Sequence, residues 1–123
     1  MAQTTIKGSD NAPYIFRDTA LTATVASGTT VPCELTGWNI INPNSTDVYV
    51  KFCNSAGATI GTTAVSKTLL VPANASIYLE HNKNASQKYF GIAMMVYCCT
   101  TLADSGSTAP TTALYIELFY KKS

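Results

Sequence analysis

Apolar and polar residues alternate along most of this chain with a period of two, the spacing of a β-strand with one buried face. The pattern is clearest over residues 46–53, where Val48, Val50 and Phe52 alternate with polar or aromatic neighbours. Gly, Pro and Asn separate such segments and favour turns, and no segment sustains the 3.6-residue period of a helix. The predicted strands are residues 14–16, 21–26, 35–42, 46–53, 67–71, 76–80, 89–100 and 113–121.

Short strands divided by turn residues predict an all-β fold. We expect a single antiparallel β-sandwich, jelly-roll or Ig-like, over residues 13–123, with essentially no helix. Residues 1–12 are polar and aperiodic, so we expect a flexible N-terminal arm there. Residues 89–100 are almost wholly apolar, which predicts a strand in the middle of a sheet, covered on both faces for part of its length.

Charge is scarce in this chain. Charged residues make up 12% of it, about half the roughly 25% usual in soluble domains, and the net charge is +1. The basic residues are scattered, which argues against a nucleic-acid partner. No apolar run approaches the roughly 20 residues that span a bilayer, so we expect no membrane partner. The first residues lack the apolar segment of a signal peptide, which favours synthesis in the cytosol.

The residues that could carry chemistry are few. The four cysteines form no CxxC pair, so we interpret them as buried free thiols, with a Cys53–Cys99 bridge as the alternative. His81 is the only histidine, which is too few for a Cys/His zinc site. The acids are dispersed, and neither a nucleophile elbow nor a phosphate-binding glycine motif occurs. We therefore expect no catalytic, cofactor-binding or metal-binding residues and no enzyme activity; a small hydrolase that uses His81 is the least favoured reading.

Aromatic residues mark the outward face of several predicted strands. Tyr49, Tyr78 and Tyr115 each precede a charged residue by two positions, and Tyr97 and Phe119 share that phase. If the strands adjoin, these five residues form a ladder on an exposed face. Ordinary cross-strand pairing is one interpretation. The other is a protein-binding interface, because tyrosine is enriched at interfaces, and an aromatic platform could also stack sugars.

Three segments of the chain carry a family pattern: GWNIINPNSTDVYVKFCNSAGATIGTT, KTLLVPANASIYLE and TTLADSGSTAPTTALYIELFYK. They resemble small virion proteins of tailed bacteriophages. The resemblance is to auxiliary capsid (head decoration) proteins, such as those of crAss-like phages. It covers residues 35–121, with matching patterns at Ile40–Phe52, Leu69–Glu80 and Leu102–Lys121. The chain departs from the pattern at Cys98 and Cys99, at Met94 and Met95, and in a basic loop from Lys83 to Lys88.

The resemblance implies a non-enzymatic virion protein without cofactors, made in the host bacterial cytoplasm and located on the capsid surface. Its implied partners are the major capsid protein and other virion proteins, with self-association into a homo-oligomer as a further expectation. A head-fibre, tail or baseplate component is the nearest alternative. A carbohydrate-binding β-sandwich is the alternative from another class.

Overall fold

The computed structural model describes residues 3–9 and 12–122, which form two antiparallel β-sheets and contain no α-helix. None of the described residues forms a helix long and apolar enough to cross a membrane. The larger sheet has the order β1 (Gln3–Ile6), β2 (Tyr14–Leu21), β10 (Leu114–Lys122), β4 (Cys33–Asn42) and β7 (Ala75–Leu79), and β8 (Lys88–Phe90) also pairs with β4. The smaller sheet has the order β3 (Ala26–Ser27), β9 (Met94–Cys99), β5 (Val48–Asn54) and β6 (Lys67–Val71).

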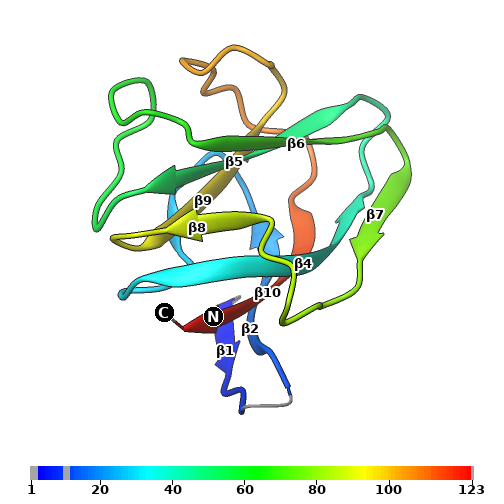
Figure 1. Ribbon diagram of the computed structural model, residues 1–123. Coiled ribbons are helices and arrows are strands. Elements are labelled where there is room, and N and C mark those ends of the chain that lie inside the picture. The colour runs from blue at the N-terminus through cyan, green and yellow to red at the C-terminus, as the bar shows by residue number, and fades with distance from the viewer. Residues whose placement is uncertain (1–2, 10–11, 123) are drawn as a thin grey trace.

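The strands pair as a nested series. β5 pairs with β6, β4 with β7, β3 with β9 and β2 with β10, all antiparallel. The chain therefore passes back and forth between the two sheets, with β5 and β6 consecutive in the smaller sheet and β7 and β8 consecutive in the larger one. Figure 1 shows β5 and β6 in one layer and β4 and β10 in the other. This nested pairing is jelly-roll connectivity. The predicted all-β, antiparallel fold is confirmed.

One hydrophobic core lies between the sheets. Val48, Val50 and Phe52 of β5 are fully buried, as the alternation predicted, and they face inward-pointing residues of β10 such as Ile116 and Leu118. Burying a large aliphatic or aromatic side chain contributes roughly 1.5–3 kcal/mol, so this shared core is the main source of stability. The remaining buried members of the core are Phe16, Leu21, Ala26, Cys33, Leu35, Ile40, Val71, Phe90, Met94, Val96, Cys98, Leu114 and Tyr120.

Two strand predictions need correction. The single strand predicted over residues 89–100 is divided into β8, which pairs with β4, and β9, which pairs with β5. The chain crosses between sheets at residues 91–93, where Gly91 permits close packing against the Tyr89 ring. Of the strand predicted over 21–26, Leu21 ends β2, Ala26 begins β3, and residues 22–25 connect the two. As predicted, β9 is covered on both faces, because all six of its residues are buried.

The N-terminal segment also differs from its prediction. Gln3–Ile6, expected within a flexible arm over residues 1–12, form β1 and pair with β2 from Gln3↔Asp18 to Ile6↔Ile15. A polar, threonine-containing segment suits this edge position, where a strand faces water. Positions 1–2 and 10–11 of the predicted arm, and position 123 of the predicted domain, lie outside the described residues.

A second, smaller hydrophobic cluster covers the outer face of the smaller sheet. Cys53, Ala93, Met95 and Tyr97 form it, and four residues pack against it: Val25, Ala58, Ile60 and Val65. Lys51, the charged residue two positions after Tyr49, lies on this outward face but is fully buried. Its ammonium donates a hydrogen bond to the Ala103 carbonyl, in the loop between β9 and β10. Loops of the chain therefore occupy this face.

All four cysteines are free and buried, as the favoured interpretation predicted. Burial raises the pKa of Cys33 and Cys53, and it raises the pKa of Cys98 to about 12. These three thiols therefore behave as small apolar side chains at neutral pH.

A buried polar cluster joins three loops at one end of the molecule. The Asn42 side-chain NH₂ donates to the carbonyls of Thr46, Val71 and Pro72, and its oxygen accepts two hydrogen bonds from Asn44. The Asn44 side chain in turn exchanges two hydrogen bonds with the Thr112 backbone, before β10. These asparagines lie in the sequence patterns that carry the resemblance, so those patterns encode at least part of the scaffold.

Candidate interface on the outer face of the larger sheet

The five predicted interface residues fall into two groups. Tyr78, Tyr115 and Phe119 lie on strands of the larger sheet, whereas Tyr49 and Tyr97 lie on β5 and β9 of the smaller one. Tyr97 is 1% exposed and belongs to the covered cluster. A single ladder of five aromatic residues is therefore not formed. The candidate interface is therefore limited to the three aromatic residues on the larger sheet.

Tyr78 and Phe119 form the aromatic part of this face. Their rings meet edge to face with centroids 6.4 Å apart, and Tyr78 is 65% exposed whereas Phe119 is 9% exposed. Phe119 pairs with Gly37 of β4, and Gly37 is in turn packed against the backbone of Leu79 and Glu80. The missing side chain at Gly37 thus lets β4 and the chain after β7 approach closely beside the aromatic pair.

A charged row crosses the same face. Arg17 of β2 donates two hydrogen bonds, of 2.9 and 2.7 Å, to one carboxylate oxygen of Glu117 on β10. Asn39 of β4 donates to the other oxygen at 3.3 Å. Burial opposes ionisation of Glu117, but these hydrogen bonds outweigh it and lower the pKa of the carboxyl below its ordinary value. The row therefore presents an ion pair between β2 and β10 that a hydrogen bond from β4 helps to hold in place.

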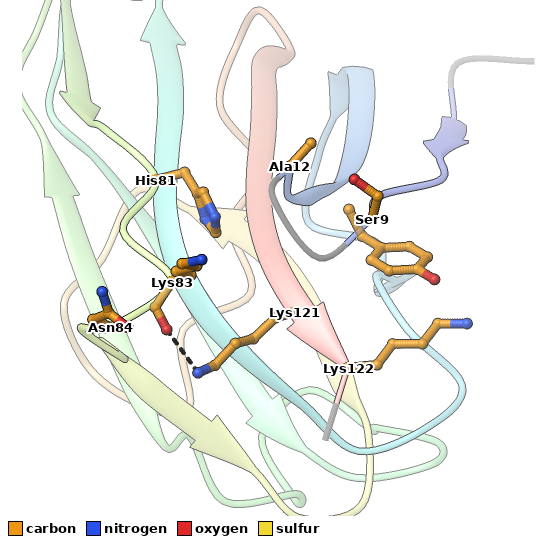
Figure 2. Close-up of a pocket in the computed structure, with 8 residues that line it drawn as sticks. Ser9, Ala12, His81, Lys83, Asn84, Lys121 and Lys122 are labelled. Carbon is orange, nitrogen blue, oxygen red and sulfur yellow. Dashed lines mark hydrogen bonds between the residues drawn. The ribbon is translucent and has the colours of Figure 1, made fainter.

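Two hollows lie beside the aromatic pair. One is a cleft of about 510 Å³ lined by Ser9, Ala12, Tyr14, His81, Lys83, Asn84, Lys121 and Lys122. Figure 2 shows His81, Lys83 and Asn84 on one side of it, Ser9 and Ala12 on the other, and the two lysines of β10 at its end. The other hollow, of about 300 Å³, is lined by Pro13, Tyr78, Glu80, His81 and Phe119. His81 is the common wall of both.

His81 is held by a hydrogen-bond chain that fixes its orientation. The Thr36 hydroxyl donates to the Phe119 carbonyl at 3.1 Å, so its oxygen accepts the 2.6 Å hydrogen bond from His81 Nδ1. Burial, together with the charges of Lys121 and Lys83, lowers the pKa of the imidazole. The neutral ring therefore carries its proton on Nδ1 and leaves Nε2 as an acceptor.

The sequence identified only part of this site. The sequence marks Lys83 to Lys88 as a basic loop, and it gives His81 no role beyond that of the least favoured alternative, a small hydrolase. The return of the chain after β7 brings that loop beside the end of β10, about 40 residues further along the chain. The available signal was the charge pair Lys121 and Lys122 in an otherwise weakly charged chain. Among the described residues, no group of three or more His, Cys, Asp or Glu side chains could hold a metal ion.

Comparison with known proteins gives little further information. No protein-family model matches the chain, and no curated protein matches it. A crystal structure of PirA is similar to it with a TM-score of 0.37 and 12% sequence identity, over 94% of this chain and 99% of that one. A likeness at this level carries no argument about function.

Proposed function

We propose that this protein is a non-enzymatic structural component of a tailed-phage virion, an auxiliary capsid protein that binds the head shell from the capsid surface. The observation that carries the proposal is the difference between the two outer faces. Loops of the chain occupy the face of the smaller sheet, whereas the larger sheet presents Tyr78 beside an ion-paired row and two hollows. Exposed aromatic surface beside polar groups is typical of protein contact sites.

The resemblance to head decoration proteins supports the same reading. Its third segment includes β10, the central strand that carries Tyr115, Glu117 and Phe119 on the candidate interface. Its other two segments include β5, β6 and β7 and the buried Asn42 cluster that joins their loops. The segments that resemble the family therefore build the candidate interface and its support.

The low charge of the chain suits many copies side by side. A net charge of +1 gives little repulsion between neighbours on a lattice. A shell displays its binding sites in a repeated array, so modest contacts can give stable occupancy if subunits also contact each other. The proposed partner is the major capsid protein, with neighbouring copies of this chain as a second contact.

Mass spectrometry of purified particles of the phage that encodes the chain tests this proposal. A copy number comparable to that of the major capsid protein supports shell decoration, and a small fraction of it favours a fibre, tail or baseplate location instead. Absence from particles contradicts the proposal altogether.

Variants then locate the contact. Purified Tyr78→Ala should leave undecorated shells largely unoccupied under conditions where the unchanged protein saturates them. Leu70→Ala, a change at a residue 50% exposed on β6 of the other sheet, is the control and should bind normally. Equal occupancy by both variants would exclude this face as the interface.

A further inference from the structure

Three of the positive charges of this protein gather at one cleft. Lys83, Lys121 and Lys122, three of the chain's eight Lys and Arg residues, line the 510 Å³ cleft together with His81, the only histidine. None of the described residues that line it is acidic. Such a gathering stands out in a chain with 12% charged residues, where like charges would otherwise separate.

The three ammonium groups are held differently. Lys121 Nζ donates to the Lys83 carbonyl at 2.8 Å and lies 3.4 Å from a carboxylate oxygen of Glu34. Lys122 Nζ lies 4.7 Å from the centre of the Tyr14 ring. Lys83 is exposed, and its ammonium makes no ion pair with any described residue. Among the described residues, one carboxylate thus faces three cations, and their summed charge at the cleft is positive.

The neighbouring hollow adds an apolar surface. His81 separates the cleft from the space between Pro13, Tyr78 and Phe119, and Glu80 lies on that second side. A carboxylate would be repelled by Glu80 and attracted by Lys83 and Lys121. The two hollows together therefore fit a chain segment that places an apolar side chain against the aromatic pair and acidic side chains among the lysines.

We propose that the basic cleft binds an acidic segment of a partner protein, with carboxylates at Lys83 and Lys121 and an adjacent apolar side chain against Tyr78 and Phe119. Nucleic acid suits the cleft less well, because three ammonium groups in a short hollow do not form the extended basic stripe that tracks a phosphate backbone. That the partner is a capsid protein rests on the proposed function. The chemistry of the cleft does not.

The single histidine gives a direct test. A short synthetic peptide of alternating phenylalanine and glutamate is titrated into the full chain while the His81 imidazole is followed by NMR. A bound carboxylate favours the imidazolium, so the pKa of His81 should rise on binding, against the lowering effect of Lys83 and Lys121 in the free protein. The same peptide with glutamine in place of glutamate should leave the His81 signal unchanged.

Charge variants identify the cations. Lys83→Glu should weaken peptide binding by about tenfold, since it replaces an attraction by a repulsion at an exposed position. Lys121→Met, which avoids placing a second carboxylate near Glu34, should weaken it by about threefold. The matched control is Lys67→Glu on β6, with the same change in net charge, and it should retain nearly full affinity.

Other ligands define what would overturn the inference. Saturation by inorganic phosphate or by a single-stranded oligonucleotide more tightly than by the acidic peptide would contradict it, as would equal loss of binding in Lys67→Glu. These outcomes also distinguish a failure of the cleft proposal from a failure of the proposed virion function. Peptide binding without incorporation into particles leaves the cleft standing and removes the virion role. If the unchanged protein binds no acidic peptide but Lys83→Glu still occupies shells normally, the virion role stands and the cleft proposal is wrong.

Discussion

Asn42 is 1% exposed and holds three backbone carbonyls with one side-chain NH₂ group. Asn42→Ala would leave those carbonyls and the Asn44 side chain without these partners. We expect a loss of about 2–4 kcal/mol in the free energy of unfolding, because unsatisfied buried polar groups are costly. Urea denaturation measures it. Asn82→Ala is the control, since the Asn82 side chain accepts a hydrogen bond from the Asn84 amide in an exposed turn and makes no other to a described residue, and it should change stability by no more than about 0.5 kcal/mol.

For single residues, the sequence predicts on which face of a strand a side chain lies, but it does not predict which residues that side chain contacts. The period of two places Tyr78, Tyr97 and Phe119 on outward faces, and they are there. It cannot say that loops cover Tyr97, because alternation along a strand carries no information about what lies above it. Asn42 and Asn44 read as turn residues in the sequence. Their hydrogen bonds to Val71 and Thr112 depend on loops distant in the chain.

At the scale of elements, β4 and β7 are held together at a position where only glycine fits. A Cβ at Gly37 would overlap the Leu79 carbonyl and lie 3.0 Å from the Glu80 carbonyl carbon and from His81 N, all of them backbone atoms. We expect Gly37→Ala to destabilise the fold by about 3 kcal/mol, because backbone gives way less easily than a side chain. Thermal and urea unfolding check this. Gly57→Ala, with no atom within 4 Å of the added carbon, should change stability by less than about 0.5 kcal/mol.

The Arg17–Glu117 ion pair between β2 and β10 makes the stability of the protein depend on pH in the acid range. The pKa of Glu117 is lowered in the folded protein, so the unfolded state binds a proton more readily. The stabilisation is therefore present above the ordinary pKa of 4.5 and is lost as pH falls through the lowered folded value. Glu117→Gln should lower the urea midpoint at neutral pH by a modest amount, because the pair is partly exposed.

At low pH, Glu117→Gln and the unchanged protein should no longer differ in stability. Well below pH 4.5 the carboxyl is protonated in both states, and the two proteins should have nearly the same midpoint. A difference that stays constant across the whole pH range would show that Glu117 acts through packing alone.

The periodicity of the sequence does not predict where some strands end or to which sheet they belong. Residues 89–100 are apolar throughout, and nothing in that run indicates a change of sheet except Gly91. The reason for the division lies in the partners: Phe90 pairs beside Cys33 of β4, whereas Val96 pairs with Phe52 of β5. The segment 21–26 alternates like a strand, yet its Thr22 carbonyl accepts one hydrogen bond from Cys98 as the chain crosses between sheets.

For the whole molecule, the fold class could be predicted and the connectivity could not. Alternation and turn residues decide that strands form, and a buried face requires two layers. Strand order depends on contacts between distant segments, such as β2 with β10, which pair Arg17 with Glu117. The basic cleft has the same origin, because the nested pairing places the C-terminal end of β10 beside the loop before β8. Both features belong to the topology and are absent from any single stretch of sequence.

Two neighbouring residues of β9 should make the folded protein less stable at high pH. Burial raises the pKa of Cys98 from 9.0 to about 12, and it raises that of Tyr97 from 10.0 to about 12. Cys98 lies in the main core and Tyr97 in the second cluster, so unfolding exposes both. Above their ordinary pKa values the unfolded chain holds fewer protons than the folded one. Stability is therefore present below pH 9 and falls as pH rises towards 12.

The expected slope in that window approaches about 1.4 kcal/mol per pH unit for each proton released. Urea denaturation under reducing conditions, repeated at increasing pH, measures it. Tyr97→Phe should reduce the slope above pH 10 and should raise stability at neutral pH by about 1 kcal/mol, because the buried Tyr97 hydroxyl has no hydrogen-bond partner among the described residues. A free energy of unfolding that stays flat from pH 9 to near pH 12 would mean that β9 is open to solvent, in conflict with the burial of both clusters.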